Sequence, residues 1–195
     1  MPAQEQLQAT QLQKIWLLSD TVLYTEAVDF VQRLVRQGDD PLPMSQVNGL
    51  LNITASKSYA ELQRFVVHQR DRNWPFPKMN IKRFYTSLEA VLERMQRERL
   101  RNEFHLLRDV SGCSIEDIRQ EIDALMALLA REFIQHVLAE NGVLLQQTEE
   151  ERKRTKEQRG GGQGGERNRQ QGPHGGGANR QQDRQQQNNR RSQWQ

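Results

Sequence analysis

The sequence predicts an all-α fold, a small bundle of about five helices followed by a disordered C-terminal tail. Apolar residues recur at three- and four-residue steps through residues 1–147, which is the period of a buried helical face, and no segment shows the alternation typical of a strand. After residue 147 the composition changes to Glu, Arg, Lys, Gln, Gly and Asn, and Trp194 is the one large apolar side chain. Residues 148–195 are therefore predicted as a disordered basic tail, because they bury too little apolar surface to offset the entropy of ordering.

The first predicted helix runs from Leu12 to Val35. Its periodic apolar residues are Leu12, Ile15, Trp16, Leu23, Ala27, Phe30, Val31 and Leu34. Gly38 and the Pro41-Leu42-Pro43 segment should end it, since glycine favours the conformation found past helix ends and proline cannot continue a helix. A second, shorter helix follows Ser45, its expected N-cap, and stops near Ser56.

Two further helices follow in the middle of the chain. The third starts at Ser58, which forms a capping-box pattern with Glu61, and ends before Trp74-Pro75-Phe76-Pro77, because residues that precede proline avoid the helical conformation. The fourth is long, with periodic apolar residues from Ile81 to Leu107, and Ser111-Gly112 breaks it.

A fifth helix is expected from Ser114, which forms a similar capping pattern with Asp117, to Asn141-Gly142. Short connections between the helices predict that sequential helices pack as antiparallel neighbours in one bundle.

Charge is distributed unevenly along the chain. Residues 1–56 carry a net charge of −3, residues 57–108 carry +6, residues 109–150 carry −7, and residues 151–195 carry +7. Basic blocks attract polyanions, whereas acidic blocks repel them or meet a basic partner. The pattern therefore favours a protein that binds nucleic acid through its basic parts.

Residue types that commonly catalyse reactions or bind metals do not form a recognisable motif in this sequence. Cys113 is the single cysteine, and the four histidines lack the spacing of a metal site. The only glycine clusters lie in the tail and lack the residues of a phosphate-binding loop. We therefore expect a protein that is not an enzyme and uses no cofactor and no metal. A signal peptide and a membrane-spanning segment are not evident, so the expected location is the cytoplasm.

Candidate RNA-binding residues come from both basic blocks. Those of the first block have few acidic neighbours in sequence: Lys57, Arg64, Arg70, Arg72, Lys78, Lys82 and Arg83. Those of the tail are Arg159, which starts an Arg-Gly-Gly triplet, Arg167 and Arg169. Four further arginines alternate with glutamates, the pattern of an exposed ion-paired helix, and are poor candidates: Arg94, Arg97, Arg99 and Arg101.

Three aromatic residues lie in or beside the first basic block. Trp74, Phe76 and Tyr85 would stack on bases if they were exposed. Packing in the core is an equal alternative for Phe76 and the favoured one for Tyr85.

Three segments carry a pattern known from one protein family: Leu42–Thr54 at the entry to a helix, Phe65–Arg72, and Phe84–Leu92. Together they resemble the small helical subunit of type III CRISPR effector complexes, in the Csm branch, and the resemblance spans about residues 10–96. Two basic positions of the family are here Gln46 and Asn48, and its Ala-Gly is Arg70-Asp71. Lys57, Arg64, Lys82 or Arg83 could replace the lost charges.

The resemblance implies a non-catalytic subunit that lies in several copies side by side along an RNA-guided complex. Its partners would be the guide and target RNA, held by backbone contacts, and the other subunits of the effector complex. The family's RNA contact transfers directly to Arg72. No membrane is involved in this function.

Two other functions remain open from the sequence. One is a stand-alone helical RNA- or DNA-binding accessory protein, similar to an RNA chaperone. The other is a protein-interaction adaptor whose charged faces are simply solvated.

Overall fold

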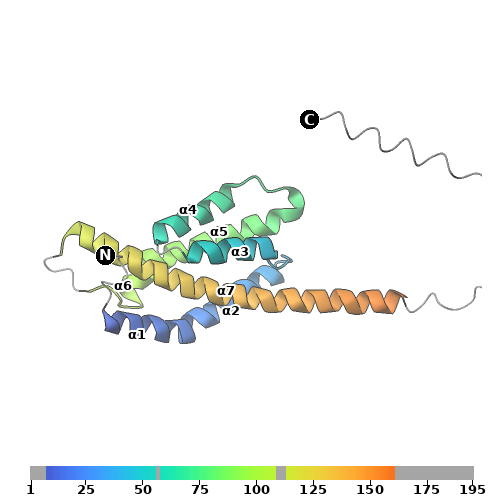
Figure 1. Cartoon of the computed structure of the whole chain (residues 1–195), viewed down its shortest axis with the longest axis horizontal. Coiled ribbons are helices and arrows are strands. Elements are labelled where there is room, and N and C mark those ends of the chain that lie inside the picture. The colour runs from blue at the N-terminus through green and yellow to red at the C-terminus, as the bar shows by residue number, and fades with distance from the viewer. Residues whose placement is uncertain (1–7, 56–57, 109–112, 161–195) are drawn as a thin grey trace, which may run out of the picture. The chain divides into compact units, whose positions relative to one another are not determined.

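The computed structural model describes the backbone of residues 8–55, 58–108 and 113–160 (Figure 1). The regular structure in these residues is helical and includes no strand, which confirms the all-α class. The chain divides into a first unit, Met1–Thr155, and a second unit, Lys156–Gln195. The predicted disordered tail falls largely on residues 161–195, which lie outside the described residues.

The first predicted helix forms as one continuous path with a wide turn inside it. Helix α1 (Ala9–Leu18) continues into a π-helical turn, η2 (Ser19–Leu23), and then into α2 (Tyr24–Arg36). The π turn brings the buried Ser19 hydroxyl to 2.9 Å from Nε2 of His136 and 3.2 Å from a carboxylate oxygen of Glu132. A polar contact thus fixes the wide turn against the last of the described helices.

Gly38 ends α2 as predicted. Its φ of 83° lies in the left-handed region, its amide donates to the Val35 carbonyl at 2.9 Å, and the Asp39 amide donates to the Leu34 carbonyl at 3.1 Å. These two bonds are the Schellman arrangement that satisfies the last carbonyls of a helix.

Helix α3 (Met44–Thr54) begins two residues earlier than predicted. Pro43, and not Ser45, occupies the N-cap, since its extended backbone (φ −66°, ψ 150°) directs its carbonyl to the amides of Gln46 and Val47. The expectation for Ser45 was therefore wrong, because a backbone carbonyl supplies the first bonds without a side-chain cap.

Helix α4 (Tyr59–Asp71) and helix α5 (Met79–Arg94) form an antiparallel hairpin, side by side in Figure 1. The predicted cap of α4 is confirmed, because the Ser58 side chain accepts a hydrogen bond from the Glu61 amide. A short 3-10 turn, η3 (Phe76–Lys78), precedes α5.

The fourth predicted helix ends before the last of its periodic apolar residues. Helix α5 continues through a second π turn, η4 (Met95–Arg99), into the short α6 (Leu100–Asn102). Phe104 and Leu106 are buried but lie in irregular chain, where His105 has a φ of 49°. Their burial explains the apolar pattern, and the left-handed residue between them explains why the helix does not continue.

Helix α7 (Ile115–Gly160) begins at the predicted cap. The Asp117 amide donates to the Ser114 hydroxyl at 3.0 Å, and the Ser114 amide donates to the Asp117 carboxylate at 3.2 Å. The predicted end at Asn141-Gly142 was wrong, because the helix continues to Gly160 and includes residues 148–160, which the sequence assigned to the tail. Glutamate, lysine and arginine are strong helix formers there, and the side chains of residues 149–157 are exposed.

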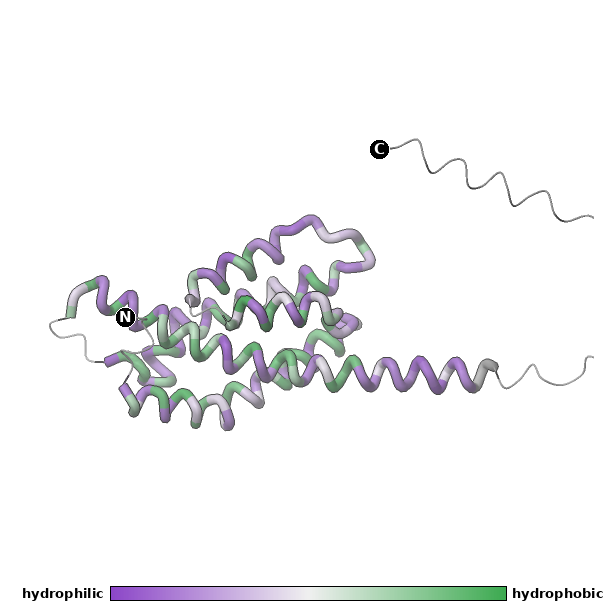
Figure 2. The backbone as a smooth tube through the Cα atoms, viewed as in Figure 1, coloured by the Kyte–Doolittle hydropathy of each residue, from purple (hydrophilic) through white to green (hydrophobic). Residues whose placement is uncertain are grey.

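The core of the first unit draws on every major helix. Phe30 of α2 makes edge-to-face contacts with Phe84 of α5 and Phe133 of α7, at centroid distances of 5.4 Å and 5.9 Å. Figure 2 shows α7 changing from mixed hydropathy over its first part to hydrophilic colour farther along. The buried apolar residues of α7 begin nine residues after its start and end before the hydrophilic stretch: Ala124, Leu125, Met126, Ala127, Leu128, Leu129, Ala130, Phe133, Ile134, Val137 and Leu138.

Candidate nucleic-acid interface

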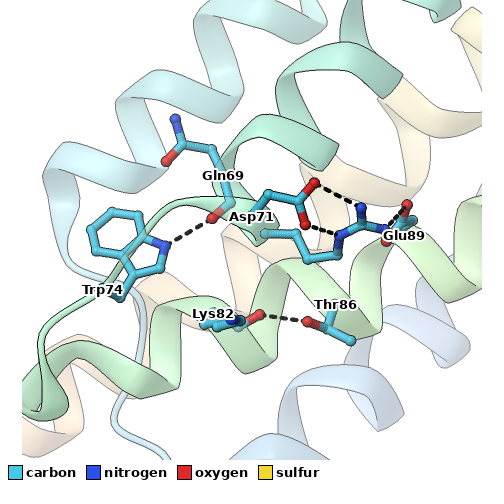
Figure 3. Close-up of polar contacts among 7 residues, drawn as sticks. Gln69, Asp71, Trp74, Lys82, Thr86 and Glu89 are labelled. Carbon is cyan, nitrogen blue, oxygen red and sulfur yellow. Dashed lines mark hydrogen bonds and ion pairs between the residues drawn. The ribbon is translucent and has the colours of Figure 1, made fainter.

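The end of the α4–α5 hairpin carries an arginine held over a tryptophan ring. The chain leaves α4 at Arg72, and Trp74 turns back so that its indole N–H donates to the Gln69 carbonyl at 2.8 Å (Figure 3). The Arg72 guanidinium lies 4.6 Å from the centroid of the Trp74 ring. Because the ring face attracts the cation without neutralising it, Arg72 remains an exposed positive charge in a fixed place.

The same turn exposes one aromatic ring. Phe76 is 91% exposed, and the exposed Lys78 lies two residues later. Trp74 and Tyr85 are buried, so the expected stacking on bases does not apply to them. Burial also raises the pKa of the Tyr85 hydroxyl. Of the three aromatics that the sequence indicated, Phe76 is thus the one with a free ring face.

Arg70 is already paired with two carboxylates. It donates to Asp71 at 2.8 Å and 2.9 Å and to Glu89 of α5 at 2.5 Å, and Figure 3 shows Asp71 and Glu89 facing the same guanidinium. The hydrogen bond to Asp71, followed by the one to Glu89, raises the pKa of Arg70. The hydrogen bond between Arg70 and Asp71 also lowers the pKa of Asp71. Arg70 therefore ties α4 to α5, and its charge is largely compensated.

Lys82 lies near this cluster on the first turn of α5. The pKa of Asp71 is lowered first by the hydrogen bond from Arg70 and by the attraction of the Arg70 charge. The charge of Lys82 makes a smaller contribution in the same direction. The Lys82 side chain is half-buried, and its carbonyl accepts a hydrogen bond from the Thr86 hydroxyl at 2.9 Å (Figure 3).

Arg83 has a buried partner that the sequence analysis did not identify. Its Nε donates to both carboxylate oxygens of Asp39, at 2.8 Å and 3.0 Å, and Nη2 also contacts Asp39. The Asp39 side chain is 3% exposed, and this hydrogen bonding raises the pKa of Arg83. Arg83 thus fixes the loop after α2 onto α5, and its charge is compensated by a carboxylate that is far away in sequence.

Arg64 is a further candidate cation on the hairpin. It is exposed on α4, and its Nε donates to the Ala60 carbonyl at 3.3 Å. Lys57, Arg167 and Arg169 lie outside the described residues. Arg159 lies in α7, but its side chain is outside the described part.

We define the hairpin surface as the described cations on α4, on α5 and on the turn between them that no carboxylate contacts, together with the exposed ring: Arg64, Arg72, Phe76, Lys78 and Lys82. Its cations suit phosphate groups and its aromatic ring suits a base, which is the combination typical of single-stranded nucleic-acid binding.

Metal and membrane features are not found in the described residues. No group of three or more His, Cys, Asp and Glu side chains in this part of the chain could hold a metal ion, and Cys113 is an exposed free thiol. None of the described helices is both long enough and apolar enough to cross a membrane.

No protein-family model matches the chain, and no curated protein or solved structure matches it at a significant level.

Proposed function

We propose that this chain is a non-catalytic, RNA-binding small subunit of a type III CRISPR RNA-guided effector complex, acting in the cytoplasm. The observation that carries the proposal is the hairpin surface, which combines the exposed Arg64, Arg72 and Lys78 and the half-buried Lys82 with the exposed ring of Phe76. The Phe65–Arg72 segment, which resembles the small-subunit family, leads directly to this surface along α4.

In this function the subunit holds the strands and does not read their sequence. Arg72, Lys78 and Lys82 contact phosphate oxygens, and Phe76 stacks on an unpaired base. Guide–target pairing supplies the sequence specificity, as in other RNA-guided systems. Arg159, Arg167 and Arg169 in the tail add affinity that does not depend on sequence.

Removing two charges from the hairpin surface should weaken RNA binding. In the full chain carrying Arg72→Gln and Lys78→Gln, we expect the Kd for a 30-nucleotide single-stranded RNA to rise by about tenfold or more, since hydrogen bonds to charged groups contribute about 1.5–3 kcal/mol each. The slope of log affinity against log salt should fall by about 1.4, because each single-strand phosphate contact contributes about 0.7. Fluorescence anisotropy over a salt series measures both quantities.

The matched control is Arg101→Gln with Arg119→Gln, which removes two exposed arginines from other helices. It should leave the Kd within about twofold of the unmodified chain. Equal weakening by the two double variants would show that only net charge matters, and it would reject the hairpin surface.

Purification from the host tests membership in the complex. We expect the tagged chain to recover short guide RNAs and several effector subunits, with more than one copy of itself per particle, because strands and neighbouring subunits raise the effective concentration for weak contacts. RNA sequencing and quantitative mass spectrometry give the composition. Recovery of diverse cellular RNAs without partner subunits would instead support the stand-alone RNA-binding accessory protein.

A further inference from the structure

A continuous groove runs between α2 and α5. It consists of two open cavities of about 430 Å³ and 330 Å³, and Arg33, Val91 and Arg94 line both of them. Phe30 and Phe133 contribute aromatic walls. We call this feature the α2–α5 groove.

Three arginines of the groove have little or no carboxylate compensation. Arg33 and Arg36 lie one turn apart on α2, where Arg33 donates to the Asp29 carbonyl at 3.3 Å and Arg36 donates to the Gln32 side-chain oxygen at 3.4 Å. Neither forms an ion pair within the described part of the chain. Three guanidinium groups thus line the groove when Arg94 is included.

Arg94 pairs with Glu98, but only loosely. The two side chains are 67% and 65% exposed and lie 3.5 Å apart, and such exposed pairs contribute roughly 0–1 kcal/mol. A bound anion can therefore replace Glu98 at small cost.

The carboxylates of the groove do not cancel its positive charge. Glu26 is held by two hydrogen bonds from the buried Arg99, at 2.5 Å and 2.7 Å, and Arg99 also bonds Glu103 at 2.6 Å. Asp29 is the other carboxylate in the lining of the larger cavity. Over the lining, four arginines, Arg33, Arg36, Arg94 and Arg99, face two carboxylates, Glu26 and Asp29, which leaves a net charge of +2.

We propose that the α2–α5 groove is a second RNA site that binds the phosphodiester backbone, separate from the hairpin surface. This inference rests on the proposed RNA-binding function. Planar guanidinium groups donate paired hydrogen bonds to phosphate oxygens, and several of them along connected cavities match the repeated charges of a strand better than a single small anion.

The test is the full chain carrying Arg33→Gln, Arg36→Gln and Arg94→Gln. We expect its Kd for a 30-nucleotide oligo-uridine RNA to rise by about tenfold or more, and its salt slope to fall by about 2, since three single-strand phosphate contacts are lost. Because all three side chains are exposed, the melting temperature should be unchanged.

The matched control removes three exposed arginines outside the groove, through Arg97→Gln, Arg101→Gln and Arg119→Gln. A groove variant with the affinity and slope of this control would overturn the groove site. An oligo-glutamate peptide that binds the unmodified chain but not the groove variant, and that leaves bound RNA in place, would also overturn it, because the groove would then serve an acidic protein segment.

The two sets of variants test the two proposed RNA sites separately. If the hairpin variant weakens binding and the groove variant does not, only the groove is rejected. If the groove variant weakens binding and the hairpin variant does not, the groove stands and the hairpin surface is rejected. An unmodified chain that binds no RNA would reject both.

Discussion

Replacing Phe30 by alanine should lower the free energy of unfolding by about 3–5 kcal/mol. Phe30 is 2% exposed, and its ring contacts Phe84 and Phe133 edge to face, so it joins α2, α5 and α7 at one point. The substitution removes both aromatic contacts and leaves a cavity between three helices that are held by other contacts.

Urea unfolding followed by circular dichroism measures this loss for Phe30. The same substitution at the exposed Phe76 is the matched control and should change stability by less than about 0.5 kcal/mol. Similar losses at the two positions would mean that Phe30 does not join the helices as described.

Asn141→Ala should cost about 2–4 kcal/mol, although it deletes a single polar side chain. The Asn141 amide accepts from the Leu42 N–H at 2.7 Å and donates to the Leu42 carbonyl at 3.1 Å, and both residues are 2% exposed. Alanine leaves the two backbone groups of Leu42 buried without partners, and each such group costs about 1–3 kcal/mol.

Asn52→Ala serves as the comparison for Asn141, because Asn52 is exposed and also lies within a helix. It corrects for the higher helix propensity of alanine. A loss at Asn141 no larger than that at Asn52 would show that water satisfies Leu42 and that the loop before α3 is not held by α7.

Local signals predicted the beginnings of helices and one helix end. Ser58, Ser114 and Gly38 act through bonds to residues three to five positions away, which a sequence displays directly. Asn141-Gly142 has the same local appearance, but Asn141 bonds a backbone far away in sequence, so the helix continues through it. A sequence pattern typical of a helix end therefore cannot be interpreted without knowing which distant residues it contacts.

The charged site was predicted in outline but not in detail. The exposed cations at Arg72 and Lys78 follow from the basic block, and Arg97–Glu93 and Arg94–Glu98 pair along the helix as predicted. The same pattern was wrong for Arg99, which is buried and pairs with Glu26 of α2. The compensation of Arg83 came from the loop after α2, which no local pattern reveals.

The α2–α5 groove was also beyond prediction. It needs two helices from separate parts of the chain to lie together, and Arg33 and Arg36 stand in a stretch whose net charge is negative.

The π turn η2 also explains an unusual spacing in the first helix. Ile15, Ser19, Leu23 and Ala27 are all buried at steps of four residues. In an α-helix of 3.6 residues per turn, a step of four rotates the side chain by about 40°, so three steps would carry Ala27 about 120° away from the direction of Ile15. The wider turn takes up that rotation and lets all four residues stay on the buried face. A run of buried positions with a strict four-residue repeat is thus a mark by which a wide turn can be sought in the sequence of an otherwise regular helix.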